Sequence, residues 1–94
     1  MNDSTIRLII AEDDFLVSEE IKRTLRGSGC EIIGTASNGE EAVKLVATLK
    51  PDVVLMDIKM PKMDGLQAAR IISEQTPVPI VCKPSQGLNF RLAT

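Results

Sequence analysis

The chain has 94 residues, of which 44% are apolar, and it carries a formal net charge of -2 with a pI near 5.0. This length allows one compact domain over residues 1–94 and leaves no room for a second. The basic residues are scattered and only two side chains are aromatic, so no basic and aromatic cluster indicates direct nucleic-acid binding. The first apolar segment is short and runs at once into acidic residues, so we expect no signal peptide, no membrane contact and a cytoplasmic protein.

The first half of the chain alternates an apolar run with an amphipathic segment. Ile6–Ala11 (IRLIIA) is apolar except for Arg7, predicts a buried strand and ends at the acidic stretch EDD. From Phe15 onward, apolar residues recur every four positions, which predicts a helix that Asp14 caps and that ends at the Gly-Ser-Gly of 27–29. Cys30–Ala36 predicts a second strand.

The second half repeats the same alternation. SNGEEA predicts the start of a second helix, with Asn38 as its cap and Glu41 three residues later. Residues 52–57 form a nearly continuous apolar run between two aspartates, which predicts a third strand, and residues 66–75 predict a third amphipathic helix. Residues 77–82 predict a fourth strand, whose two prolines indicate an edge or a strand start.

This β-α-β-α-β-α-β pattern with short loops predicts an α/β fold with a doubly wound parallel sheet. Strands that are apolar on both sides need helices on both faces of the sheet. Cys30 and Cys82 fall in the second and fourth strands, and because the chain contains no histidine they indicate reduced core thiols and no metal site. The tail over residues 82–94 shows no clear periodicity, so no element is predicted there.

Three carboxylates are expected to meet at one edge of this sheet. Glu12 and Asp13 follow the first strand and Asp57 ends the third, and parallel strands present their carboxyl ends at the same edge. Crowded carboxylates are costly unless a cation neutralises them, and an oxygen-only site favours Mg²⁺ or Mn²⁺. The alternative is that Glu12, Asp13 and Asp14 only cap the first helix and that Asp57 is a loop residue. The coincidence of both groups at the ends of parallel strands favours the metal site.

Three motifs occur together in this order: IIAEDD at the end of the first strand, SNGEEA at the second helix, and DVVLMDIKMPKMDGL around the third strand. In this combination the chain resembles the receiver domain of two-component response regulators, over residues 6–81. The positions of the last motif that match are Asp57, Met60, Pro61, Met63, Asp64 and Gly65. The resemblance implies a flavodoxin-like fold with strand order 2-1-3-4 that lacks the usual last strand and last two helices.

The resemblance also implies a function. Asp57 would accept a phosphoryl group from a histidine kinase or a phosphotransfer protein. Glu12, Asp13, Asp57 and the backbone carbonyl of Lys59 would hold Mg²⁺ (or Mn²⁺), with Glu12 acting through a water. Phosphoryl transfer depends mainly on positioning and charge neutralisation, which such a site supplies. The chain would then be a phosphoacceptor in signal transduction and not an enzyme that acts on an external substrate.

The loop after the third strand would need a particular backbone to present the Lys59 carbonyl. Pro61 would contribute by fixing its φ angle, and Gly65 by tolerating a positive φ. An ordinary turn would use the same two residue types, so both interpretations agree on this loop.

After Val81 the sequence departs from the family pattern, which continues with a Thr or Ser, a fourth helix, a fifth strand with an aromatic residue and then a Lys-Pro pair. Two alignments remain open. In one, an internal deletion makes Lys83 and Pro84 this pair, so that Lys83 could reach the phosphoryl oxygens. In the other, the alignment continues without a gap, Pro84 stands where the hydroxyl residue is expected, and the tail is unrelated sequence.

The missing elements lead to two further expectations. The usual conformational readout would be damaged, since Phe90 in the tail lies on no predicted strand, and a non-switching interaction module is therefore the competing hypothesis. The fourth strand would also be a free edge beside uncovered apolar sheet surface. We therefore expect a homodimer, with the tail or the fourth strand exchanged between the two copies as one form of it.

Overall fold

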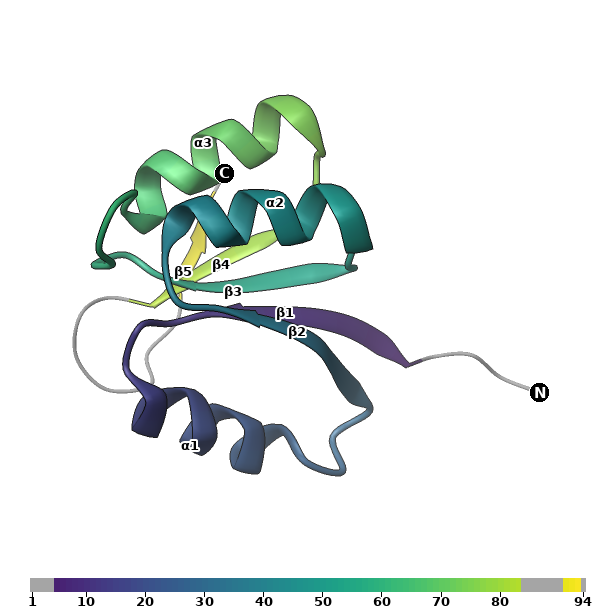
Figure 1. Ribbon diagram of the computed structural model, residues 1–94. Helices are drawn as coiled ribbons and strands as arrows, with labels where there is room; N and C mark the ends of the chain where they lie inside the picture. Colours follow the sequence, from purple (N-terminus) through teal and green to yellow (C-terminus); the bar gives the residue numbers. More distant parts are fainter. Residues whose placement is uncertain (1–4, 84–90, 94) are drawn as a thin grey trace.

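Three helices pack against a five-stranded sheet in the computed structural model, which describes residues 5–83 and 91–93 (Figure 1). The elements in chain order are β1 (Ile6–Ala11), α1 (Phe15–Leu25), β2 (Cys30–Ala36), α2 (Gly39–Leu49), β3 (Val53–Asp57), α3 (Gly65–Gln75), β4 (Ile80–Lys83) and β5 (Arg91–Ala93). β2, β1, β3 and β4 lie side by side in that order and are parallel. α2 and α3 cover one face of the sheet and α1 covers the other, which confirms the predicted doubly wound arrangement (Figure 1).

The fourth strand differs from its prediction at its start and at its outer edge. It begins at Ile80, after both prolines, and the carbonyl of Pro79 accepts a hydrogen bond from the Val54 amide at 3.0 Å. The expectation that β4 is a free edge is wrong, because Ile80 pairs with Ala93 and the next two residues pair with the rest of β5, in antiparallel register. The tail thus satisfies backbone groups of β4 that would otherwise be exposed. Pro84 and Phe90 lie outside the described residues.

Asx residues cap all three helices at their N-termini. The side chains of Asp14, Asn38 and Asp64 each accept a hydrogen bond, at 2.8 to 2.9 Å, from a backbone amide two or three residues further on. Such caps satisfy amides that have no acceptor within the helix. The caps at Asp14 and Asn38 were predicted, and the cap at Asp64 makes α3 begin at Gly65, one residue earlier than predicted. Within residues 5–83 and 91–93, no helix is long and apolar enough to cross a bilayer.

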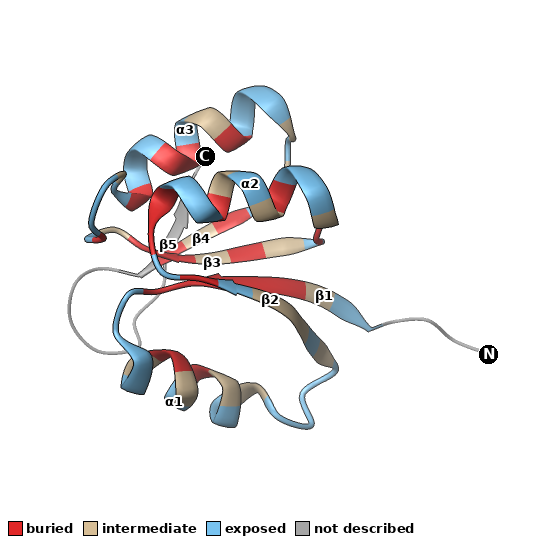
Figure 2. Cartoon of the chain, viewed as in Figure 1, coloured by how far each residue is buried: buried red, intermediate tan, exposed pale blue. Residues whose placement is uncertain are grey.

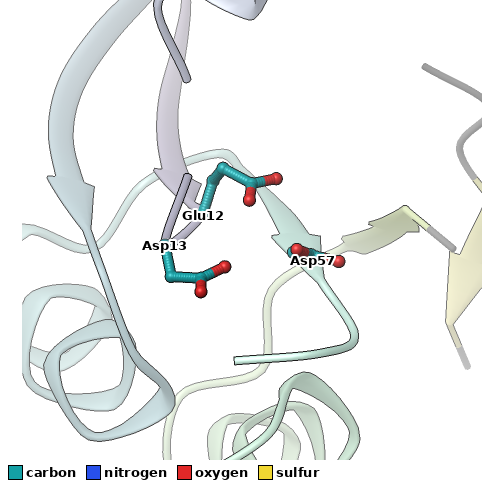
Figure 3. Close-up of side chains that lie close together, drawn as sticks. All are labelled: Glu12, Asp13 and Asp57. Atoms are coloured by element: carbon teal, nitrogen blue, oxygen red, sulfur yellow. The ribbon is translucent and has the colours of Figure 1, made fainter. Parts of the chain in front are cut away.

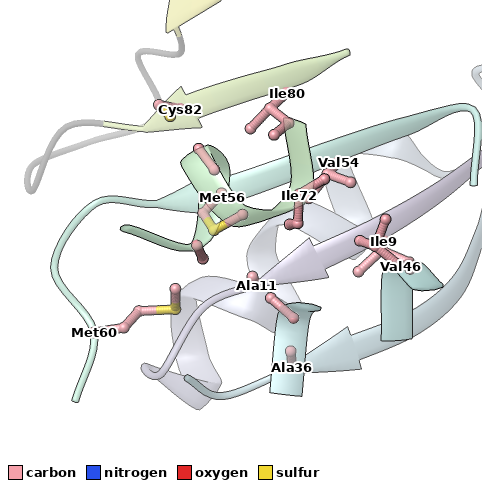
Figure 4. Packing of buried hydrophobic residues seen from close by; sticks show 13 residues of the cluster. Ile9, Ala11, Ala36, Val46, Val54, Met56, Met60, Ile72, Ile80 and Cys82 are labelled. Carbon is pink, nitrogen blue, oxygen red and sulfur yellow. The ribbon is translucent and has the colours of Figure 1, made fainter. Parts of the chain in front are cut away.

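The main core lies between the sheet and the helix pair α2 and α3 (Figures 2 and 4). Alternate residues of the strands point to this side, as the two-residue period of a strand requires. The strand residues in it are Ile9, Ala11, Ala36, Val54, Met56, Ile80 and Cys82, and Ala42, Val46, Ala68, Ala69 and Ile72 meet them from the helices. In the register between β1 and β3, Ala11 is opposite Met56. The residues that follow these two, Glu12 and Asp57, are therefore neighbours at the carboxyl edge of the sheet.

Arg7 attaches the other end of α2 to the sheet. Its guanidinium donates to the carbonyl of Lys50 and to the carbonyl of Leu49, each at 2.9 Å. These carbonyls belong to the last turn of the helix and have no amide partner within it. The backbone amide of Arg7 also donates to the Asp52 carboxylate at 2.8 Å, just before β3. The amino edge of the sheet is thus tied together well away from the acidic edge.

Candidate metal-binding site

The structure brings Glu12, Asp13 and Asp57 together at the carboxyl edge of the sheet. One carboxylate oxygen from each of the three lies within 4.8 Å of the other two. In Figure 3, Glu12 and Asp13 extend from the end of β1 towards Asp57 at the tip of β3. Residues more than forty positions apart in the sequence therefore form one acidic cluster, as expected from the parallel strands.

Two of the three carboxylates are buried. Glu12 is only 6% exposed and Asp57 only 7% exposed, whereas Asp13 is exposed. Removing carboxylates from water is costly unless a positive charge is close by, and a divalent cation would provide it. Three carboxylates, with no sulfur or nitrogen ligand among them, form the type of donor set that Mg²⁺ and Mn²⁺ prefer. The residues present therefore fit the predicted ion.

Helix capping does not account for Glu12 and Asp13. Asp14 occupies the N-cap of α1, with its side chain accepting from the Leu16 and Val17 amides. The Glu12 side chain instead accepts a hydrogen bond from the Asp14 amide at 3.1 Å, which helps to hold its carboxylate at the end of β1. The capping function and the acidic cluster are thus carried by different residues.

The loop after β3 folds back on the strand from which it emerges. The Gly65 amide donates to the Ile58 carbonyl at 2.7 Å, which closes the loop, and the Lys59 amide lies 3.4 Å from the Asp57 carboxylate that it faces. The expected positive φ at Gly65 is wrong, since the positive φ of this loop, 66°, falls on Lys62. Gly65 is required for space: a Cβ there would overlap the Asp57 carbonyl oxygen and lie 2.9 Å from the carbonyl carbon. Pro61 is exposed in this loop, and its φ-fixing role stays a prediction.

Lys83 lies directly across from Asp57 in the backbone. The two residues are register partners in the parallel pairing of β3 with β4, so their Cα atoms are on adjacent strands spaced by about 4.8 Å. The structure thus places Lys83 at the end of the fourth strand and not on a separate fifth strand. Both alignments are compatible with this position. An internal deletion that joins the start of the family's fourth strand to the end of its fifth would place the lysine here, and so would an unrelated tail with a lysine at this position by chance. Its proposed role with the phosphoryl group stays a prediction.

A cavity of about 280 Å³ adjoins the acidic cluster on the side of α1 and the end of β2. Its wall includes Thr35, Ser37 and Glu41, which the sequence did not single out as site residues. The Glu41 carboxylate accepts from the backbone amide of Ser37 at 2.7 Å and from its hydroxyl at 3.0 Å. These two hydrogen bonds, the backbone one first, lower the pKa of Glu41. The SNGEEA motif was the available signal, because a Glu at this position of a capping box reaches back across the helix start.

The sequence of this chain matches one protein family and several of its members. A family model described as "Response regulator receiver domain" matches residues 8–87. Among curated proteins, the transcriptional regulatory protein PdtaR of Mycobacterium tuberculosis (strain ATCC 25618 / H37Rv) is 47% identical over 75 residues, which are 80% of this chain and 37% of the relative. Protein-glutamate methylesterase/protein-glutamine glutaminase 4 of Geobacter metallireducens is 49% identical over 77 residues, which are 81% of this chain and 22% of the relative. This chain thus spans well under half the length of either protein.

Solved structures agree with the sequence matches. The response regulator domain of Thermotoga maritima CheB superposes with a TM-score of 0.83 at 30% identity, over 86% of this chain and 61% of that one. A chain of the CheX-CheY-BeF3-Mg²⁺ complex from Borrelia burgdorferi superposes with a TM-score of 0.81 at 29% identity, over 89% of this chain and 65% of that one.

Proposed function

The chain belongs to the response regulator receiver domain family, and from this membership we propose that it is a phosphoacceptor in a two-component phosphorelay. The proposed donor is a histidine kinase or a histidine phosphotransfer protein, and the proposed acceptor is Asp57. The proposed metal is Mg²⁺, with Mn²⁺ as its substitute. Acting as an acceptor, the chain would turn over no external substrate.

The observation that carries the proposal is the position of Asp57 within the acidic cluster. Its carboxylate stands at the end of a buried strand, is 7% exposed, and has oxygens of Glu12 and Asp13 within 4.8 Å. A nucleophile held in this way needs little reorganisation before it reacts. The solved complex named for CheX, CheY, BeF3 and Mg²⁺ also supports a receiver-type site that works with this ion.

In the proposed reaction, an oxygen of Asp57 attacks the phosphorus of a phosphohistidine. The new oxygen–phosphorus bond forms as the nitrogen–phosphorus bond breaks, and the imidazole nitrogen keeps the bonding electrons and takes up a proton. A bound divalent cation supplies neutralisation of the charge on the phosphoryl oxygens. Asp13, Asp57 and the Lys59 carbonyl would bind it directly and Glu12 would position one of its waters. Glu12 and Asp57 are buried in the unphosphorylated chain, which would limit the access of bulk water to the reacting carboxylate.

The proposal is tested by incubating the protein with Mg²⁺ and a small phosphodonor such as acetyl phosphate, followed by intact mass spectrometry. We expect one phosphoryl adduct in the wild type and none in Asp57→Asn. Asp52→Asn is the matched control, because Asp52 lies at the opposite end of the same strand and holds the Arg7 amide instead of facing the cluster. A folded wild type that takes up no phosphoryl group, or an adduct that persists in Asp57→Asn, would contradict the proposal.

A second candidate function is an interaction module that keeps the acidic cluster without a conformational switch. The sequence of β4 favours it, because the four residues Ile80–Lys83 include no hydroxyl side chain that could bind a phosphoryl group on Asp57 and move with it. The two candidates differ in the response to phosphorylation. Amide chemical shifts that change only around the acidic cluster, with none along β4 and β5, would favour the non-switching module.

A further inference from the structure

The N-terminus of α2 is joined to the loop that follows Asp57. Gly39 is the first residue of this helix, and its amide has no acceptor within the helix. It donates instead to the backbone carbonyl of Met63 at 2.9 Å. Gly39 is buried at this contact, which connects two segments that lie more than twenty residues apart in the sequence. We call this contact the α2 tether.

Space, not conformation, makes glycine necessary in the α2 tether. A Cβ at Gly39 would overlap the carbonyl oxygen of Met63 and would lie 2.7 Å from its carbonyl carbon and 2.8 Å from its Cβ. These atoms are backbone or next to it, so they cannot move aside as the end of a long side chain can. Any side chain at position 39 would therefore push the loop away from α2.

A hydrogen bond and core packing hold the loop at several other points, so it has little freedom to shift away from a side chain at position 39. At its ends, Ile58 and Gly65 are joined by the 2.7 Å hydrogen bond that closes it. In its middle, Met60 is 9% exposed and belongs to the main core, and Met63 packs against the same core. Lys59 lies between two held residues, and its amide faces the Asp57 carboxylate at 3.4 Å. A displacement at Met63 would therefore strain a loop that is held at both ends, and Lys59 is the loop residue whose amide faces Asp57.

We propose that Gly39 is a positioning residue for the metal-binding loop: by allowing the α2 tether, it sets where the Lys59 carbonyl stands relative to Glu12, Asp13 and Asp57. This inference rests on the proposed function, since that carbonyl is one of the proposed Mg²⁺ ligands. Mg²⁺ demands near-ideal octahedral geometry with short oxygen distances, so it responds to a small shift of one ligand. A misplacement of about 1 Å at a reacting centre can lower a rate by about a hundredfold.

The test compares Gly39→Ala with two other glycine variants by calorimetric titration with Mg²⁺ alone. Gly34→Ala adds the same methyl group on β2, where it meets the ends of the Leu49 and Leu45 side chains. Gly29→Ala adds it at a φ of +90° with nothing within 4 Å, so it strains the backbone far from the loop. We expect the Kd for Mg²⁺ to rise about tenfold in Gly39→Ala. Both controls should keep the wild-type Kd, although Gly29→Ala should lower the unfolding midpoint.

A second measurement applies to the wild type and does not depend on whether Gly39→Ala folds. Coupling between two sites is reciprocal, so Mg²⁺ binding must strengthen the α2 tether if the tether strengthens Mg²⁺ binding. We expect Mg²⁺ to slow hydrogen exchange of the Gly39 amide several-fold more than that of the Gly34 amide. Equal slowing at both amides, or a Gly39→Ala variant that binds Mg²⁺ as tightly as the wild type, would overturn the positioning role of Gly39 and leave the proposed metal site in place. A wild type that binds no Mg²⁺ would overturn the proposed metal site as well.

Discussion

Asp57 and Lys83 are register partners at the ends of β3 and β4, so a carboxylate residue and a cationic residue stand side by side at the acidic edge of the sheet. In the family pattern, the lysine that reaches the phosphoryl group follows the fifth strand. In this chain Lys83 is already next to Asp57 in the sheet, so β4 would provide the positive charge that a later strand provides in the family.

If Lys83 assists phosphoryl transfer, Lys83→Ala should slow phosphorylation of Asp57 by about tenfold or more, because a positioned cation stabilises charge on the transferring group. The measurement is the rate of adduct formation with a small phosphodonor and saturating Mg²⁺. Lys44→Ala, on the exposed side of α2, is the matched control. Equal rates in Lys83→Ala and the wild type would favour the gap-free alignment, in which the Lys-Pro pair is accidental.

Gly65 should reject every side chain for reasons of space. Gly65→Ala should destabilise the fold by about 1–3 kcal/mol, because the new Cβ meets the Asp57 backbone. Asn tolerates a positive φ far better than Ala does, so it separates a steric requirement from a conformational one. We expect Gly65→Asn to be no more stable than Gly65→Ala in urea unfolding. At Gly27, with a φ of +77° and open space around it, Asn should be the milder substitution. Rescue by Asn at position 65 would speak against the steric account.

The hydrogen bonds from Ser37 should make stability depend on pH through Glu41. The pKa of Glu41 is lowered from 4.5 in the folded chain, chiefly by the Ser37 backbone amide and then by its hydroxyl. A lowered folded pKa stabilises the fold above the unfolded value, and this contribution is lost as the pH falls through the folded pKa. The destabilisation caused by Glu41→Gln should therefore be larger at pH 7 than at pH 3. Thermal unfolding across this range measures it, with Glu40→Gln as the matched control, and a difference independent of pH would contradict the assignment.

The predicted homodimer now needs a different contact surface. β5 covers the edge of β4, so the outer strands of the described sheet are β2 and β5. β5 has only three residues and offers little edge, whereas β2 has seven. We expect association of two copies when the protein is measured by light scattering at micromolar concentration. A mass that stays monomeric over this range would remove the homodimer from the account.

The sequence predicted four strands and three helices because long periodic segments and Asx caps act locally. The strand order followed from the family resemblance, and the acidic cluster from the carboxyl ends of parallel strands meeting at one edge of the sheet. β5 escaped prediction because three residues show no period, and its pairing with Ile80 depends on tertiary contact. The start of β4 was misplaced because prolines mark a strand start or an edge equally well. Gly65 was assigned the wrong cause, since a glycine needed for space and one needed for positive φ look the same in a sequence. Gly39 was missed because its partner Met63 lies close to it only in the folded chain, so the sequence gives no sign that position 39 lacks space for a side chain.

In the proposed reaction, Asp57, within the cluster formed with Glu12 and Asp13, accepts a phosphoryl group and needs a divalent cation to do so. The most direct test is peptide-level mass spectrometry of the wild type after exposure to a small phosphodonor, with Mg²⁺ and then with excess chelator. We expect a single phosphoryl group on Asp57 with Mg²⁺ and almost none with chelator. A modified residue other than Asp57, or labelling of Asp57 that is equal in the two conditions, would contradict it.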